Sequence, residues 1–330
     1  MNKLVMIVGG STLVYAGLAF MMGVLPGIEL SRVPAGAGVE PLTALEAQGR
    51  EVYVANGCGY CHTQQVRPLD EDRVFGRPSA ASDFTYQTPE LLGSERTGPD
   101  LTNIGTRQPS SVWQYIHLYE PRAVVPESIM PSFSWLFEVV DHAPAGMTAV
   151  PLPSAFAPTR GVVVPTHEAE ALIAYLAALK QPAWSGSGGE GGAAGTTTAA
   201  PGSSSRPSAG AAAGAAAGGY DAAKGASLYT SNCSACHQAN GEGLAGAFPP
   251  LKGNDVVNDG DATEHIHVVL RGLQATRVGG VVYGGVMPSF AARLSDADVA
   301  AIIDYERSSW GNHGTSIIAG QVAAERAKPR

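Results

Sequence analysis

The sequence contains CGYCH at residues 58–62, and CSACH at residues 233–237 repeats its pattern. Both have the form C-x-x-C-H, the attachment signal of a c-type haem. Two thiols separated by two residues lie on one turn, where each can add to a haem vinyl group, and the following histidine ligates the iron. The pattern therefore predicts two covalently bound haem c groups. The attachment residues are Cys58, Cys61, His62, Cys233, Cys236 and His237.

A C-x-x-C pair can also be half of a zinc site or a thioredoxin-like redox pair. The chain has four cysteines, and the two motifs contain all of them. No further pair is left to complete a separate zinc ribbon, and no thiol is left for a disulfide. A zinc site shared between the motifs would have to join two modules separated by a long linker. The residues therefore favour haem over a zinc or dithiol site.

The composition suits two modest domains with connecting material. The chain has 330 residues, and only 15% of them are charged, which indicates that part of the length is anchor and linker. The net charge of -8 disfavours nucleic acid as a partner. An acidic surface suits a basic electron-donor protein, although a merely solvated surface explains the charge more simply.

The N-terminus begins with an uncharged run from Leu4 to Ile28. As a helix this run is ~37 Å long at ~1.5 Å per residue, enough to cross the ~30 Å core of a bilayer. A cleaved signal peptide is the alternative, but its apolar core is normally shorter and ends at a small-residue cleavage site. We therefore predict a retained single-pass anchor in the cytoplasmic membrane. Lys3 places the N-terminus in the cytoplasm and both haem motifs on the periplasmic or extracellular side.

We predict a mainly α-helical chain with two cytochrome c domains. Residues 185–219 are Gly, Ala, Ser, Thr and Pro apart from Glu190 and Arg206. This composition predicts a flexible tether that keeps the second domain near the first. The residues after Gly311 lack a packing pattern, which predicts a partly disordered tail. The expected segments are an anchor at 1–28, a neck at 29–41, a first domain at 42–183, a linker at 184–219, a second domain at 220–312 and a tail at 313–330.

Each domain is expected to begin and end with a helix. An amphipathic helix over 42–55 leads into the first motif, and Gly49 and Tyr53 recur as Gly225 and Tyr229 before the second. The glycine would let another helix approach closely, and the tyrosine would pack in the core. The closing helices are expected at 167–180, capped by a threonine, and after residue 295, where a capping-box pattern precedes an apolar run.

The second axial ligand is predicted from a repeated tetrapeptide. The sequence MPSF occurs at residues 130–133 and again at 287–290, downstream of each motif. The proline restricts Met130 and Met287 to extended backbone, which favours their role as iron ligands over simple core packing. Met147 reads as a loop residue. Methionine ligation would raise the reduction potential of each haem.

Histidines compete for that role, and His117 on an expected helix at 111–119 is the strongest rival. The prolines in TGPDL at 97–101 and FPPL at 248–251 occupy the place from which a carbonyl can orient the iron-ligating histidine. The other available histidines are His142, His167, His265, His267 and His313.

Three further stretches resemble one family. They are CHTQQVRPL at 61–69, GSERTGPDL at 93–101 and HLYEPRAVVPESIMP at 117–131, and together they are similar to the monohaem cytochrome c subunit (subunit II, CcoO) of cbb3-type haem-copper oxidases. The resemblance covers about the first 180 residues and includes the N-terminal membrane helix. It implies that His62 and Met130 are axial ligands, and that the subunit docks on the catalytic subunit and other oxidase subunits and passes electrons towards oxygen reduction.

The C-terminal half departs from that family and resembles a generic class I cytochrome c. The simplest electron path runs from a soluble or membrane donor to the haem at His237, then to the haem at His62, then to the oxidase core. We expect no oxygen reduction by the chain alone, because nothing in it supplies a catalytic metal centre.

Other functions stay open at this point. A cytochrome c subunit of a nitric oxide reductase is disfavoured by the run at 63–68. A dihaem cytochrome c peroxidase is disfavoured by the two methionine loops, which leave no open iron position for peroxide. A membrane-tethered electron shuttle without an oxidase is a further alternative.

Overall fold

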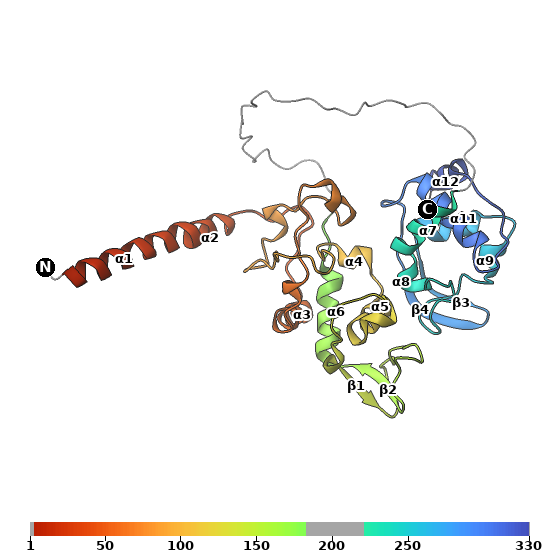
Figure 1. Ribbon diagram of the computed structural model, residues 1–330, viewed down its shortest axis with the longest axis horizontal. Coiled ribbons are helices and arrows are strands. Elements are labelled where there is room, and N and C mark those ends of the chain that lie inside the picture. The colour runs from red at the N-terminus through yellow and green to blue at the C-terminus, as the bar shows by residue number, and fades with distance from the viewer. Residues whose placement is uncertain (1–2, 183–220, 330) are drawn as a thin grey trace, which may run out of the picture.

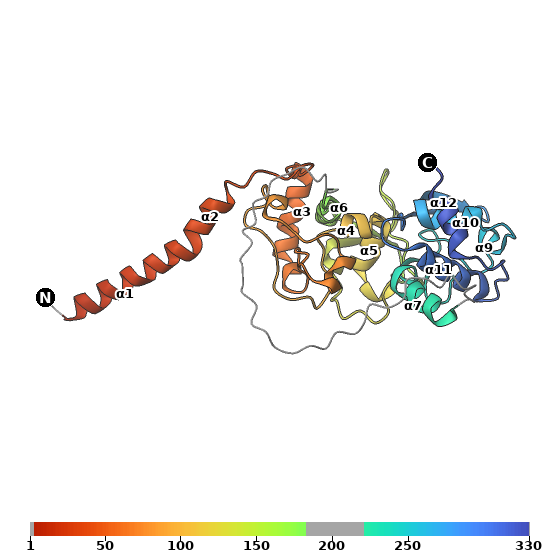
Figure 2. The ribbon, with the colours of Figure 1, turned by 90° about the horizontal axis from the view of Figure 1, so that it is seen from above.

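The N-terminal segment forms one long helix that projects from the rest of the chain (Figures 1 and 2). The computed structural model describes residues 3–182 and 221–329, so the predicted linker at 184–219 lies outside the described residues. α1 (Lys3–Ala19), a π-helical turn (Phe20–Val24) and α2 (Leu25–Leu30) follow one another without a break. Within the described residues this is the one helix long and apolar enough to cross a membrane, and none of it is buried.

The neck after this helix is held against the first domain. The backbone N–H of Gly36 donates to the carbonyl of Ser82 at 3.0 Å, and that of Val39 donates to the carbonyl of Gly36 at 3.0 Å. Gly38 has a φ of 81°, and a Cβ on it would lie 3.1 Å from the Cβ of Pro182. The chain therefore enters and leaves the first domain at the same place.

The first domain is organised around the crossing of α3 (Ala44–Ala55) and α6 (His167–Ala178) (Figure 1). A capping box between Thr43 and Glu46 begins α3, and Thr166 caps α6. A Cβ on Gly49 would lie 1.9 Å from the carbonyl oxygen of Ala171, so the glycine lets the two helices touch. Both helices agree with the sequence prediction to within two residues at each end.

The remaining elements of the first domain pack around this pair. They include α5 (Ser111–Tyr119), which matches the predicted helix, and α4 (Ile104–Arg107). An antiparallel hairpin of β1 (Phe137–Val140) and β2 (Val162–Pro165) was not expected. Short 3-10 helices lie at Cys58–Tyr60, Asp70–Val74, Ala81–Asp83, Pro121–Ala123 and Ser134–Leu136.

The second domain repeats the arrangement with different lengths. α7 (Ala222–Asn232) crosses α11 (Asp296–Ser308), and a Cβ on Gly225 would lie 2.5 Å from the carbonyl oxygen of Ala301. The capping box predicted at Ser295 and Asp298 begins α11. The other elements are α8 (Ser234–His237), α9 (Asp255–Asn258), α10 (Thr263–Arg271), α12 (Ala319–Arg326), and the antiparallel strands β3 (Leu273–Val278) and β4 (Val281–Met287).

The C-terminal segment differs from the sequence prediction, because it contains a packed helix. The expectation that residues 313–330 form a tail without packing is wrong for the part that contains α12, which packs on α10 and α11. Ile317 and Val322 are buried in the core of the second domain. Glu325 pairs with His267 at 2.7 Å. Ile317 just before the helix, Val322 within it, and the ion pairs of Glu325 and Arg326 hold this segment, which gives too few apolar positions for a visible period.

Both domains are mainly α-helical, as the sequence predicts. Within the described residues each contains one two-stranded hairpin. Their arrangement brings α5 of the first domain beside β4 of the second (Figure 1). The two domains therefore meet along a face that includes the second motif.

Candidate haem sites

The first motif lies on the turn that ends α3. Gly57 has a left-handed φ of 69°, which stops the helix and turns the chain into the motif. The backbone N–H groups of Cys61 and His62 both donate to the carbonyl of Cys58, at 3.2 and 3.1 Å. The two cysteines and the histidine therefore share one tight turn, which is the arrangement that attachment to a single porphyrin requires.

His62 is oriented by the loop at residues 97–101. Its Nδ1 donates to the carbonyl of Pro99 at 2.7 Å, which leaves Nε2 as the nitrogen able to ligate iron. A Cβ on Gly98 would lie 2.2 Å from Cε1 of His62, so glycine leaves the ring its space. Burial lowers the pKa of His62 and favours the neutral ring. A neutral imidazole held in this way fits the proximal ligand of a haem.

Asp100 ties the first motif to the loop that carries Pro99. Its Oδ2 accepts from Oγ1 of Thr63 at 2.6 Å and from the backbone N–H of Gln65 at 2.9 Å. Its Oδ1 accepts from the backbone N–H of Thr102 at 2.9 Å. Because Thr63 and Gln65 directly follow the motif, the carboxylate fixes the spacing between His62 and its hydrogen-bond partner.

A second carboxylate, Asp72, lies at the centre of a buried ion-pair network. Arg67 pairs with it at 2.8 Å and Arg96 at 2.5 Å, and its side chain is 1% exposed. Arg96 also donates from Nε to Oγ1 of Thr63 at 2.6 Å. The two arginines belong to two separate stretches of the first domain, so the network joins them. The burial of Asp72 is not predictable from the sequence, since a run of charges such as DEDR normally lies in solvent.

Replacing Asp72 with asparagine should destabilise the first domain strongly. The hydrogen bonds from Arg67 and Arg96 hold the pKa of Asp72 well below its usual 3.8. The ionised carboxylate therefore stabilises the fold above about pH 4, and this contribution falls as the pH drops and the unfolded chain takes up the proton. We expect Asp72→Asn to lose ~3 kcal/mol at pH 7, because the buried carboxylate loses its charge and the mostly buried guanidinium of Arg96 loses its partner, together with the half-exposed one of Arg67.

Denaturant unfolding at pH 7 and pH 4 measures this effect. Asp70→Asn is the matched control, because Asp70 forms an exposed ion pair with Arg73 at 2.8 Å. An exposed pair contributes ~0–1 kcal/mol. If both variants lost the same free energy of unfolding at pH 7, the network around Asp72 would stabilise the first domain no more than an exposed ion pair does.

The second motif repeats the geometry of the first at the end of α7. The N–H groups of Cys236 and His237 donate to the carbonyl of Cys233, at 3.1 and 3.0 Å. Nδ1 of His237 donates to the carbonyl of Pro249 at 2.9 Å. The two prolines singled out in the sequence therefore accept from the two motif histidines, which confirms that part of the analysis.

A cavity of about 420 Å³ opens beside the second motif. Cys233, Cys236, His237 and Met287 all line it, so the structure brings the predicted attachment residues and the predicted distal ligand together. An apolar cavity with two cysteines and a histidine on one wall and a thioether elsewhere fits a haem c. Met287 is half-buried there.

The surroundings of Cys58 and Cys236 disfavour the thiolate form. Burial raises the pKa of Cys58 to about 11 and that of Cys236 to about 12. Nucleophilic or redox-active cysteines have lowered pKa values instead. In residues 3–182 and 221–329 no three Cys, His, Asp or Glu side chains gather as a metal site. The residues thus fit a covalently bound porphyrin better than the alternatives weighed above.

Both MPSF segments are anchored in the same way. The serine hydroxyls of Ser132 and Ser289 donate to the carbonyls of Tyr119 and Leu270, at the C-terminal ends of α5 and α10. The following phenylalanine N–H groups also donate to these helices, at 2.8 Å in the first domain and 3.1 Å in the second. Met130, which packs against the same core as Cys58, therefore occupies the position equivalent to Met287.

The rival histidines mostly have other partners. His265 pairs with Glu306 at 2.8 Å and His267 with Glu325 at 2.7 Å, although His265 also lines the second cavity. His117 stacks on Trp113 with ring centroids 4.4 Å apart. Burial lowers the pKa of His117 to about 4, so it is neutral at pH 7. His142, His167 and His313 are exposed.

Comparisons with known proteins match both halves of the chain. Residues 1–150 match the family model described as "Cytochrome C oxidase, mono-heme subunit/FixO", and residues 222–310 match cytochrome c. Over 94 residues the chain is 43% identical to cytochrome c-552 of Thermus thermophilus, an alignment that covers 27% of this chain and 70% of that protein. The chain belongs to the cytochrome c family. This cytochrome joins a FixO-type N-terminal region to a class I cytochrome c domain.

Two further relatives are subunits of larger assemblies. This cytochrome is 33% identical over 111 residues to the gluconate 2-dehydrogenase cytochrome c subunit of Pantoea cypripedii, covering 33% of this chain and 25% of that protein. It is 31% identical over 95 residues to the cbb3-type cytochrome c oxidase subunit CcoP of Azospirillum sp. (strain B510). That alignment covers 27% of this chain and 29% of that protein. The cytochrome therefore spans only about a quarter of each of these two relatives.

These matches establish the broad chemistry of this cytochrome. Its cytochrome c domains imply covalently bound haem c, and its relatives are electron-transfer subunits of oxidase and dehydrogenase complexes. The apolar N-terminal helix and the FixO match together indicate attachment to a membrane.

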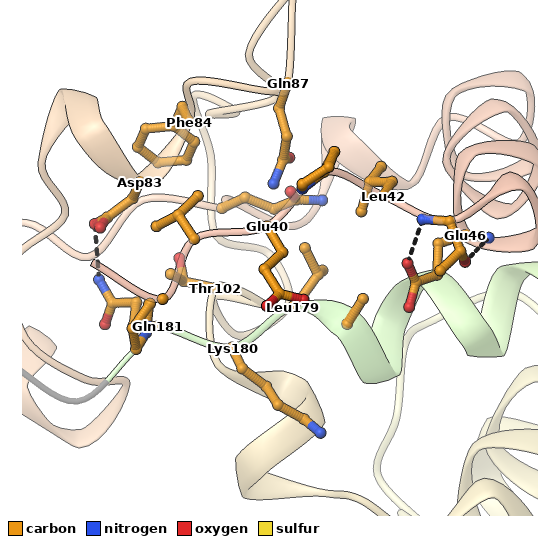
Figure 3. Close-up of a pocket in the computed structure, with 17 residues that line it drawn as sticks. Glu40, Leu42, Glu46, Asp83, Phe84, Gln87, Thr102, Leu179, Lys180 and Gln181 are labelled. Carbon is orange, nitrogen blue, oxygen red and sulfur yellow. Dashed lines mark hydrogen bonds between the residues drawn. The ribbon is translucent and has the colours of Figure 1, made fainter. Parts of the chain in front are cut away.

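A further cavity, of about 340 Å³, lies between the neck, the start of α3 and the end of α6 (Figure 3). Gln64 and Thr102 line it, and each has a buried atom, Nε2 and Oγ1, without a hydrogen-bond partner among the described residues. No cysteine, methionine or histidine is among its lining residues. None of the predicted haem residues therefore lines it.

Proposed function

We propose that this cytochrome binds two haem c groups and passes electrons to the haem-copper catalytic subunit of a cbb3-type oxidase. The observation that carries the proposal is the FixO-type region, in which the stretches at 61–69 and 93–101 fold into the network that orients His62. The second domain adds an equivalent motif with its own proline-held histidine. The proposed axial pairs are His62 with Met130 and His237 with Met287.

The residues of this cytochrome support electron transfer over catalysis. When bound, haem c would supply reversible one-electron chemistry. As proposed iron ligands, the thioethers of Met130 and Met287 would favour the reduced state relative to a second histidine and would leave no open position for a substrate. The prolines hold the histidine rings in place, so the ligands need little reorganisation when the charge on the iron changes.

We place the second haem before the first in the electron path. An external donor would reduce the site at His237, from which the electron reaches the site at His62 and then the oxidase core. The membrane helix would cross the cytoplasmic membrane with its N-terminus inside, which leaves both cytochrome domains on the periplasmic or extracellular side. The net charge of -8 suits a basic donor.

Purification through a C-terminal tag from solubilised membranes tests this proposal. We expect two haem c groups per chain and co-purification of a multi-helix subunit that carries the oxygen-reducing centre. The complex should consume oxygen, whereas the isolated cytochrome should not. One haem per chain would contradict the dihaem assignment. Recovery of a dehydrogenase as the stable partner would assign the cytochrome to the class of its gluconate 2-dehydrogenase relative instead.

A further inference from the structure

The two cytochrome domains touch at the second haem motif itself. Nε1 of Trp113 donates to the carbonyl of Ala235, which lies between the two cysteines, at 3.1 Å. Nε2 of Gln108 lies 3.8 Å from Sγ of Cys236. Oγ of Ser110 accepts from the backbone N–H of Val286 on β4 at 3.4 Å. Polar groups at the start of α5 thus contact the attachment turn of the other domain.

Residues of the first domain also complete the cavity of the second. Ile104, Arg107, Gln108 and Trp113 line it together with the second motif. Pro99 lines it as well, and the carbonyl of Pro99 is the group that accepts from His62 at 2.7 Å. One residue therefore touches the second cavity and holds the histidine of the first site.

The contact is apolar as well as polar. Leu244, Ala247 and Phe248 of the second domain are buried in the same core cluster as Trp113. Trp113 is 8% exposed, and its ring stacks on His117 at an angle of 17°. A buried tryptophan that fills a pocket and makes a hydrogen bond at its edge is typical of the residues that dominate the stability of an interface.

We infer that the face formed by Gln108, Ser110, Val112 and Trp113 is a built-in docking site for the second cytochrome domain. Electrons cross between the two haems at this face, past Trp113 and Pro99. With haem c bound at both motifs, the site at His237 would give up one electron and the site at His62 would accept it. No bond forms or breaks and no proton moves.

This inference rests on the proposed dihaem function, and it names the face at which the two domains exchange electrons. The tether keeps the second domain at a high local concentration, so a modest interface is enough to keep it docked. Donors would therefore meet the docked pair as one unit.

Disulfide trapping in the full-length dihaem protein tests the docking. A Cβ on Gly284 would lie 3.9 Å from Cγ2 of Val112, so the pair Val112→Cys and Gly284→Cys brings two sulfurs within bonding reach. With the native cysteines bound to haem, these are the only free thiols. After cleavage at a protease site inserted into the linker, we expect the two halves to stay joined until a reductant is added.

The matched control pairs Gly284→Cys with Val54→Cys. Val54 is exposed on α3, which lies on the far side of α6 from the second domain in both views (Figures 1 and 2). This pair should not form the bond. If the Val112 and Gly284 pair failed to cross-link in a protein that still carried two haems and still co-purified with its oxidase, the docking would be refuted while the proposed function stood.

Val112→Asp tests the same face at a partly buried side chain that packs at the edge of the core. A charge placed in a contact that excludes water should lower the rate of electron exchange between the haems at least about tenfold, because the docked population falls. Trp113→Ala should do the same, and Trp113→Phe should restore part of the rate. Flash reduction of one haem, followed by time-resolved absorption spectroscopy, measures this rate of electron exchange. Unchanged rates in both Val112→Asp and Trp113→Ala would rule out transfer at this face.

Discussion

Replacement of Met130 by histidine is expected to lower the midpoint potential of the first haem by a few tenths of a volt, within the ~0.8 V range that axial ligands span. The thioether is a weak donor that favours ferrous iron, whereas a second imidazole favours ferric iron. The neighbouring backbone should tolerate the change, because Ser132 and Phe133 still anchor the segment to α5. A redox titration followed by visible absorption measures the shift.

Met287→His should lower the potential of the second haem in the same way and leave the first unchanged. Met147→Leu is the control, because Met147 is exposed in a loop and is not a predicted ligand. A Met130→His protein with the potential of the wild type would show that another residue ligates the first iron. His117 would then be the candidate, and His117→Ala should change the absorption of that haem.

Replacement of Gly49 by alanine is expected to prevent stable folding of the first domain. The added Cβ would lie 1.9 Å from the carbonyl oxygen of Ala171 and 2.8 Å from the Cβ of Tyr175, so a helix backbone would have to move. Overpacking costs ~1–3 kcal/mol and more where backbone is displaced. We expect a loss of at least ~3 kcal/mol, a large share of the ~5–15 kcal/mol that stabilises a typical domain.

Yield of haem-loaded protein and denaturant unfolding measure the effect of Gly49→Ala. Gly225→Ala should have a similar but smaller effect in the second domain, where the nearest atom is 2.5 Å away. Gly260→Ala is the control, since Gly260 has open space around its Cα. Equal stability of Gly49→Ala and Gly260→Ala would mean that the helix crossing does not need its glycine.

Features encoded in short repeated stretches could be predicted from the sequence. The C-x-x-C-H turns, the prolines that orient His62 and His237, and the glycines at the helix crossings each depend on a few neighbouring residues, and the second copy made each pattern recognisable. The capping residues Thr166 and Ser295 are local in the same sense.

Features that depend on distant pairing could not be predicted in this way. Asp72 is buried only because Arg67 and Arg96 converge on it from two parts of the chain. Trp113 lies on a helix that was predicted, yet its partner, Ala235, belongs to the other domain. The helix α12 shows few apolar positions because ion pairs share in holding it.

The hydrogen bond from Gly36 to Ser82 has a practical consequence for anyone who prepares a water-soluble version of this protein. Cutting the chain just before α3 would remove the neck residues that line the cavity in Figure 3. Pro182 would then lose its neighbour Gly38. A shortened gene that starts at about Val33 keeps these neck residues, and with them the packing around Pro182 at the end of the first domain.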